Sequence, residues 1–330
     1  RVTMDENELM GSMKVSKAVA KMAIPSVISS LVTVVYNMAD TFFVGQTGDP
    51  LQVAAVSLTN PIFILFMAFA NMFGMGGSAA ASMALGEKKE KRVKQVSSFI
   101  TYASLVVGIV FAVILLVGMQ PVLQLFGADA DTYELAKGYT TYISYGAPFI
   151  IWSAAASFVV RADGASREAM TGSMIGTVAN IILDPIFISG FGMGAAGAAI
   201  ATTIGNIMAS VYYLWYFCRK SRNMSMAFRY FKCGDKILFQ ICSAGLPTAI
   251  FSALMSISTI ILNQILVAYG NALPATILSI LRQGVLLIPV LYGLNALLGL
   301  HGVIYGQALT DYVAVLLSVV IWRWKRRKTL

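Results

Sequence analysis

The stretch YNMADTFFVGQTGD, residues 36–49, contains an acid where the surrounding chain is apolar. It closes a segment, residues 18–44, that is long enough to cross a bilayer as a helix, which takes about 20 residues. Asp40 lies inside that segment, and Asn37 precedes it by one helical turn. An ionisable side chain at membrane depth costs at least about 2.5–3.5 kcal/mol on insertion scales. We therefore treat Asp40 as a candidate functional residue.

The composition predicts an all-α polytopic membrane protein. The 330 residues are 58% hydrophobic and only 12% charged, whereas soluble domains carry about 25% charged residues. Nine segments have the length and apolarity of membrane spans. They lie near residues 18–44, 53–84, 96–119, 139–160, 169–190, 196–217, 237–268, 277–298 and 302–322.

The positive charges predict how these spans are oriented. Basic residues gather before the first span, in GEKKEKRVKQ (86–95), in RADGASRE (161–168), in the stretch after residue 217 and in the tail RWKRRKTL (323–330). The alternate gaps hold almost none. By the positive-inside rule, both termini and these loops are cytoplasmic, in a multi-pass protein of the inner cell membrane. The net charge of +9 is then an orientation signal, and we expect no nucleic-acid partner.

Nine spans would place the two basic termini on opposite sides, so an odd number of spans is missing from this count. An internal repeat gives the same result. Residues 23–49 resemble residues 245–271 at an offset of 222, whereas residues 194–222 resemble residues 299–327 at an offset of 105. The offsets differ by 117 residues, about three spans with their loops, and the difference arises near residues 270–282. Such repeats are common in transporters.

The repeat predicts two lobes. Residues 1–217 form a six-helix N-terminal lobe, residues 218–236 a cytoplasmic linker, and residues 237–330 an incomplete C-terminal lobe with three spans. About nine spans of an expected twelve are thus present.

Three acids lie within spans: Asp40, Asp184 and Asp311. Spans 1 and 5 run in the same direction, so the first two acids are expected at similar depth, each sharing a helix face with an Asn three or four residues earlier (Asn37 and Asn180). Thr202 is a further candidate partner, and Pro185 should loosen the helix beside Asp184. These oxygen atoms suit a proton or a small hard cation such as Na⁺.

Other interpretations of these residues remain open. The buried acids and amides could pair with one another for purely structural reasons. Asp311 aligns with Asn206 in the repeat and could be a simple hydrogen-bonding partner. GMGAAG (192–197) fits a dinucleotide-binding pattern, but no strand precedes it, so we expect a tight outer turn that enters a closely packed helix.

The chain resembles the MATE (multidrug and toxic compound extrusion) family of cation-coupled exporters. The resemblance rests on IPSVISSLVTVVYNMADTFFVGQTGD (24–49), SMALGEKKEKRV (82–93), RADG (161–164), NIILDPIFI (180–188) and GAAGAAIATTIGN (194–206). It implies a two-lobed bundle around a central cavity that opens alternately to each side. It also implies a cation site inside the first lobe, formed by Asp40, Asn180, Asp184, Thr202 and a main-chain oxygen near Ala198.

The resemblance implies a transporter rather than an enzyme. We expect an antiporter that uses H⁺ or Na⁺, without a cofactor, to export small organic, often cationic, drugs across the lipid bilayer. Tyr36, Asn37 and Asp311 are candidates for the substrate cavity. The alternatives are a flippase for a lipid-linked substrate on the same architecture, and a truncated chain that binds cations without transporting anything.

Overall fold

The computed structural model describes residues 49–268, except 222, 232–233 and 235–236, together with the isolated helical residues Ile28, Val32 and Phe43. The side chains of residues 50, 253 and 255–268 are outside this description. The chain divides into two compact units, Arg1–Met255 and Ser256–Leu330. All packing described below belongs to the first unit. From the second unit, the structure describes the helical backbone of residues 256–268, the end of α9.

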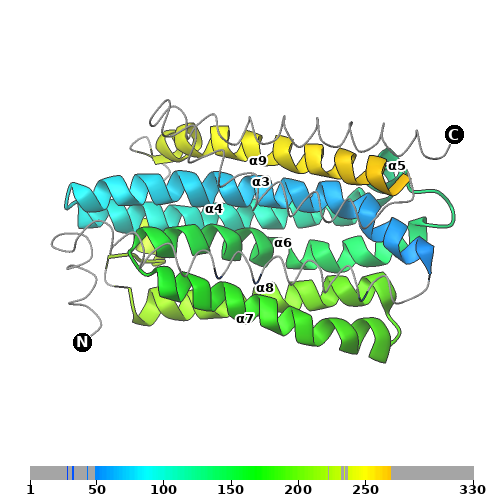
Figure 1. The fold of residues 1–330 in the computed structure, drawn as a ribbon. Coiled ribbons are helices and arrows are strands. Elements are labelled where there is room, and N and C mark those ends of the chain that lie inside the picture. Colours follow the sequence, from blue (N-terminus) through cyan, green and yellow to red (C-terminus); the bar gives the residue numbers. More distant parts are fainter. Residues whose placement is uncertain are drawn as a thin grey trace, which may run out of the picture. The chain divides into compact units, whose positions relative to one another are not determined.

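The helix α3, Pro50–Gly86, begins where the quoted stretch ends (Figure 1). Asp49 caps it, because its carboxylate accepts a 2.9 Å hydrogen bond from the Leu51 amide. Pro50 occupies the first helical position, where its missing N–H group costs nothing.

The remaining described elements follow the predicted order, and none of them is a strand. They are α4 (Glu90–Val117), α5 (Met119–Leu125), α6 (Tyr133–Ala162), α7 (Ser166–Pro185), the π-helix η1 (Ile186–Gly190), α8 (Gly194–Arg219), the 3₁₀ turn η2 (Phe228–Tyr230) and α9 (Ile237–Ala268). Five of the described segments, namely α3, α4, α6, α7 with η1, and α8, are long and apolar enough to cross a membrane. The all-helical membrane fold is therefore confirmed. The eighth and ninth predicted spans lie outside the described residues, as does the first except for Ile28, Val32 and Phe43.

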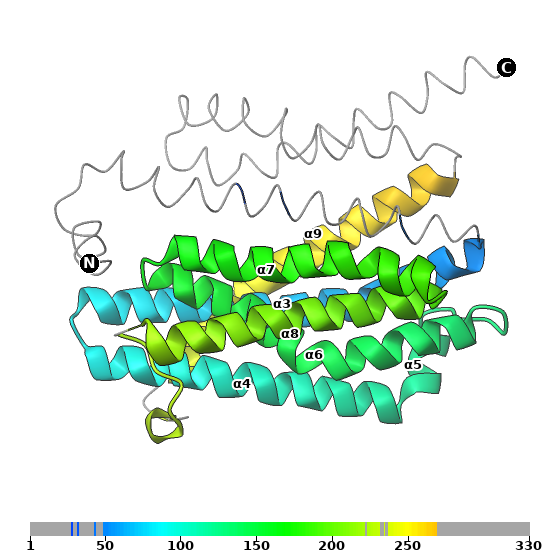
Figure 2. The same cartoon turned by 90° about the horizontal axis from the view of Figure 1, so that it is seen from below.

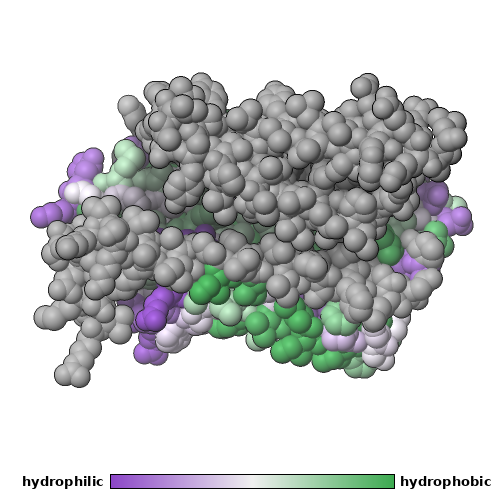
Figure 3. Space-filling model, in the orientation of Figure 1, coloured by the Kyte–Doolittle hydropathy of each residue, from purple (hydrophilic) through white to green (hydrophobic). Residues whose placement is uncertain are grey.

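The long helices run antiparallel, so alternate connections meet at the same end of the bundle (Figure 2). The α3–α4 and α6–α7 turns and the end of α8 lie together, on the left of Figure 1. This end contains the basic stretches of the sequence, and hydrophilic residues gather on it in Figure 3, whereas apolar residues cover the visible middle of the bundle. We call it the basic end.

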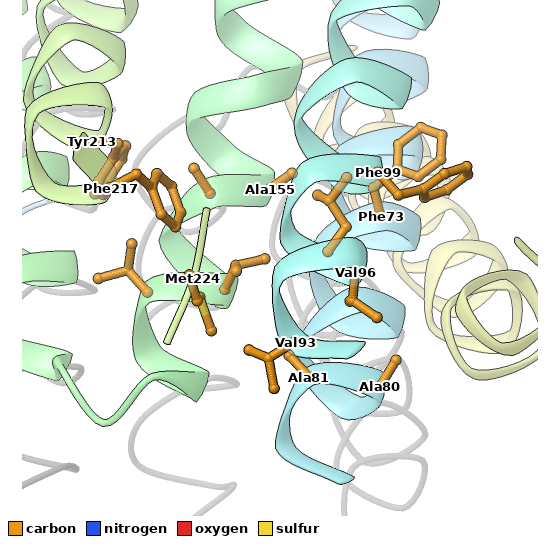
Figure 4. Packing of buried hydrophobic residues seen from close by; sticks show 14 of the residues in the cluster. Phe73, Ala80, Ala81, Val93, Val96, Phe99, Ala155, Tyr213, Phe217 and Met224 are labelled. Carbon is orange, nitrogen blue, oxygen red and sulfur yellow. The ribbon is translucent and has the colours of Figure 1, made fainter. Parts of the chain in front are cut away.

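Helix α6 is the centre of the first unit. It packs against α3, α4, α7 and α8, and 72% of its most apolar window is buried, compared with 28% for both α3 and α4. Around its basic-end half lies the largest apolar cluster, to which α3, α4 and α8 contribute Phe73, Val96 and Phe217 (Figure 4). Two residues from the first turns of α9, Ile237 and Ile241, complete this cluster, so that end of α9 belongs to the first unit.

The opposite face of α4 carries large apolar residues that are about half exposed or more. They are Val106, Ile109, Val110, Val113 and Val117, and they lie on successive turns of the helix. This outward apolar stripe is suited to lipid.

The turn before α8 has the tight form expected from its sequence. Gly192 and Gly194 have positive φ angles of 66° and 54°, which an L side chain rarely adopts. The Gln52 side chain accepts a 2.8 Å hydrogen bond from the Ala195 amide, so the beginnings of α3 and α8 are joined. The turn interpretation of GMGAAG is confirmed.

Candidate functional site

Asp184 is fully buried in the last turn of α7. It lies one residue before Pro185, the last residue of the regular helix, and η1 follows directly. Proline removes a backbone donor from the helical ladder, and the chain continues with wider π-helical turns, as shown by the 2.9 Å bond from the Phe191 amide to the Ile186 carbonyl. The predicted loosening of the helix beside Asp184 is therefore present. π-Helical turns within α-helices are frequent at functional sites.

Asn180 connects Asp184 to the next helix. Because a carboxylate only accepts hydrogen bonds, the amide satisfies its neighbours when its nitrogen faces Asp184 Oδ2, at 2.8 Å. Its oxygen then accepts from the Thr202 amide at 2.9 Å and from the Thr202 hydroxyl at 3.1 Å. In a regular helix the Thr202 amide bonds the Ala198 carbonyl, so Asn180 competes with that carbonyl for the same donor. All three side chains are buried.

A close approach of two backbones makes this arrangement possible. A Cβ atom on Gly205 of α8 would lie 2.6 Å from the Gly176 carbonyl oxygen of α7, and a Cβ on Gly176 would lie 2.9 Å from the Gly205 oxygen. Small residues at such a crossing let membrane helices approach closely. The crossing lies one turn from Asn180 and Thr202 and keeps them within hydrogen-bonding distance.

The structure thus brings together three predicted site residues, Asn180, Asp184 and Thr202. Ala198 lies one turn before Thr202 and packs against Ile188 of η1. Asp40, Tyr36, Asn37 and Asp311 lie outside the described residues. Phe43 is described, and it packs against the cluster formed by Ile188 and Ala198.

A cavity of about 240 Å³ extends from this site along the groove between α7 and α8. Asn180 and Thr202 line one end, and Ser173 and Tyr213 line the other. Helix α6 contributes Ser153, Ala154 and Ser157, and α3 contributes Phe63 and Met67. The lining is therefore mixed: α6, α7 and α8 contribute hydroxyl and amide groups, and apolar side chains make up the rest.

The sequence contained a signal for this cavity that its analysis missed. On α7, Ser173, Thr177, Asn180 and Asp184 are separated by four, three and four positions, which places them on one helix face. The polar residues of α8 that line the cavity have a similar spacing; they are Thr202, Asn206 and Tyr213. A polar stripe on an otherwise apolar span would have predicted a lined cavity rather than an isolated site.

The basic end has a second polar cluster, centred on Asp163 of the RADG motif. Its carboxylate accepts hydrogen bonds from the Tyr216 hydroxyl at 2.8 Å, the Ser221 hydroxyl at 2.7 Å and the Asn223 amide at 3.1 Å. The linker then runs along α4, where the Tyr102 hydroxyl donates to the Met226 carbonyl at 2.9 Å. The carboxylate thus joins the linker to the first unit.

Within the described part of the chain, no three His, Cys, Asp or Glu side chains form a group that could hold a metal ion. The chemistry of the buried site is that of one carboxylate, one amide and one hydroxyl. These groups can hold a proton or provide oxygen ligands for a hard cation.

A helical bundle with apolar spans and a buried carboxylate between them defines a polytopic membrane protein with an intramembrane polar site. Residues 25–186 match the family described as MatE. The multidrug export protein MepA of Staphylococcus saprophyticus is 35% identical over 257 residues, which are 78% of this chain and 57% of that relative. MepA of Staphylococcus aureus is 33% identical over the same shares. The chain is thus similar to members of the MATE family over these residues.

Solved structures are similar in fold. A crystal structure of MATE in complex with MaD3S has a TM-score of 0.76 and 26% identity, and the match covers 96% of this chain and 72% of that chain. A transporter of the MOP superfamily from Pyrococcus furiosus has a TM-score of 0.74 and 28% identity, with coverage of 96% and 71%.

The chain spans 57% of the length of the MepA relatives that it matches. Because 257 residues make up this share, the relatives are about 450 residues long. They exceed this chain by a length close to the 117 residues that separate the two repeat offsets. The position of that difference, near residues 270–282, stays a prediction.

Proposed function

We propose that this chain is the cation-coupled part of a MATE antiporter, which exports organic, often cationic, drugs by alternating access when H⁺ or Na⁺ binds its buried carboxylates. The observation that carries the proposal is the hydrogen-bonded series Asp184–Asn180–Thr202, which joins α7 to α8 inside the bundle. A buried carboxylate in a membrane span is costly, and a charge that is neutralised in each transport cycle gives a reason for keeping it.

Asp40 is the second proposed member of the site. Phe43 packs against Ile188 and Ala198, and three residues span at most about 11 Å even when fully extended. The position of Phe43 therefore supports an Asp40 close to the two helices that carry Asn180 and Thr202. Two carboxylates held close in a low dielectric repel one another and favour the uptake of a proton or cation.

The Asn180 amide gives this site two different responses. A proton on Asp184 removes one of the acceptor positions to which the amide nitrogen donates. A Na⁺ ion would instead attract the amide oxygen, which would have to leave the Thr202 amide. Either event alters the contact between α7 and α8, and it favours one transport state only if the ion binds that state more tightly.

The substrate class is supported by the printed names of the relatives, which are multidrug export proteins. The basic end is proposed to face the cytoplasm of an inner-membrane protein, with both termini on that side.

The test uses the chain reconstituted in liposomes with an imposed H⁺ or Na⁺ gradient and a fluorescent organic cation. Asp40→Asn and Asp184→Asn should abolish gradient-driven transport, whereas Asp131→Asn, a change in an exposed acid of the loop before α6, should not. Undiminished transport in both buried-site variants would refute the proposal. A wild-type chain that is stabilised by the cation but transports nothing would support the alternative of a cation-binding, non-transporting fragment.

A further inference from the structure

We propose that the cavity between α7 and α8 is a water-filled antechamber of the cation site, and that Tyr213 seals its inner end against ion leak across the first unit. The inference rests on the proposed function, since it assumes that Asp184 exchanges ions with water. The inference adds a water-filled path to the cation site and a barrier, Tyr213, at the end of that path.

The cavity has the size and lining of a hydrated space. Its volume of about 240 Å³ corresponds to roughly eight water molecules at about 30 Å³ each. Hydroxyl and amide groups from α6, α7 and α8 line it, including Ser153, Ser157, Thr177 and Asn206. A cavity that offers a water molecule two to four polar partners can hold it, whereas a wholly apolar cavity stays dry. The water would reach Asn180, whose amide contacts Asp184.

Tyr213 closes the end of the cavity that is farthest from Asp184. Its side chain is 1% exposed, and its hydroxyl donates to the Ala169 carbonyl at 2.8 Å and lies 3.0 Å from the Ser173 hydroxyl. The ring rests on the backbone of α7, since a Cβ atom on Gly172 would come within 2.3 Å of the ring carbon Cε1. Hydrogen bonds and close packing together hold the ring across the groove.

The barrier beyond Tyr213 is thin. Helix α7 begins at Ser166, only three residues before Ala169, which is about 4.5 Å along a helix axis. At that end Glu168 contacts both the Tyr212 hydroxyl and the Lys220 ammonium group. The Tyr213 ring therefore separates the cavity from a charged surface at the basic end.

This arrangement makes a specific prediction about leak. Coupled transport requires that the cation site exchange ions with one side at a time, and water continuous from Asp184 to the basic end would let ions cross without substrate. Removal of the Tyr213 ring opens such a path, whereas removal of its hydroxyl alone leaves the ring in place.

The experiment measures the decay of a pH gradient, and separately of a Na⁺ gradient, across liposomes that contain the full chain without any organic substrate. Tyr213→Ala should accelerate the decay of at least one gradient several-fold, and Tyr213→Phe should leave both at the wild-type rate. Phe217→Ala is the matched control, because it removes a buried aromatic ring of the same cluster that does not line the cavity. Gly172→Ala, which displaces the ring without removing it, should also leak and serves if Tyr213→Ala fails to fold.

Asp184→Asn combined with Tyr213→Ala tests whether the leak passes through the cation site. The double variant should return to the wild-type decay rate. A wild-type decay rate in both folded seal variants would overturn the proposal, as would an equal leak in Phe217→Ala or a leak that persists in the double variant. This assay requires no drug export, so it tests the seal separately from the proposed function. The seal can be refuted while gradient-driven transport still depends on Asp184. Conversely, the proposed function can be refuted while the Tyr213 variants still leak.

Discussion

The Tyr216 hydroxyl donates a 2.8 Å hydrogen bond to Asp163 Oδ2, and the Ser221 hydroxyl donates to the same oxygen. Tyr216 belongs to α8 and Ser221 to the linker. One carboxylate from the turn after α6 thus joins the last turns of α8 to the linker that follows.

Asp163→Ala should release the linker from the first unit. Three donors would lose their shared acceptor, and leaving such groups unsatisfied costs about 1–3 kcal/mol for each buried one. We expect faster cleavage between residues 220 and 228 in limited proteolysis and a lower unfolding temperature. Asp131→Asn, at an exposed position, is the control. An unchanged cleavage rate in Asp163→Ala would show that the linker is held by its α4 contacts instead.

Gly205→Ala should separate α7 from α8. The added methyl group would lie 2.6 Å from the Gly176 carbonyl oxygen, and overpacking of this kind costs typically about 1–3 kcal/mol. We expect a lower unfolding temperature and a weaker stabilisation by the coupling ion, because Asn180 and Thr202 move apart. Gly86→Ala is a suitable control, since a Cβ atom there meets nothing within 4 Å. An equal ion response in both variants would contradict the role of the close crossing.

The loop between α5 and α6 should show a simple pH dependence. Asp129 accepts hydrogen bonds from the Thr132 hydroxyl at 2.6 Å and the Thr132 amide at 3.0 Å, and these bonds lower the pKa of the Asp129 carboxyl. A lowered pKa in the folded state means that the contribution to stability is present above the unfolded pKa, about 3.9, and is lost as the pH falls through the folded pKa. Thr132→Val should raise the pKa of Asp129, as measured by NMR titration of the carboxyl carbon. An unchanged pKa of Asp129 would show that the Thr132 backbone amide alone lowers it.

The orientation can be tested with a native cysteine. Cys218 is exposed near the end of α8, at the basic end. In a chain with Cys233→Ser and Cys242→Ser, a membrane-impermeant maleimide should label Cys218 in inverted membrane vesicles and not in intact cells. Labelling in intact cells only would reverse the predicted orientation.

The repeat predicts that the protein in its source cells is longer than 330 residues. Intact-mass spectrometry of the protein purified from those membranes should give a mass above 35.4 kDa by about 117 residues, the difference between the two repeat offsets. Peptides that map between residues 270 and 282 would locate the addition. A mass of 35.4 kDa would show that the shorter chain is the natural product.

The sequence predicted the helices well because their signals are local. Long apolar segments indicate where helices run. Asn180, Asp184 and Thr202 could also be predicted, since polar groups in apolar spans are conspicuous. Their arrangement could not, because it depends on how closely α7 and α8 approach at Gly176 and Gly205, and sequence spacing does not report the distance between helices.

The seal and the linker contacts were harder to predict for the same reason. Tyr213 lies in an aromatic stretch of α8, VYYLWYF (211–217), where nothing in the sequence distinguishes the ring that crosses the groove from its neighbours. Asp163 was visible in RADG as part of a motif. Its three hydrogen-bond donors lie 53–60 positions later in the chain, so only the folded structure connects them.

The outward stripe of Val106, Ile109, Val110 and Val113 on α4 has a consequence for the biogenesis of this protein. These side chains are about half exposed in the described part of the chain, so the apolar face that a translocon and the surrounding lipid would recognise is present before the bundle packs. Insertion of α4 is therefore independent of the polar chemistry between α7 and α8. Variants that lose the cation site should still reach the membrane, and their loss of function can be distinguished from a failure of membrane insertion.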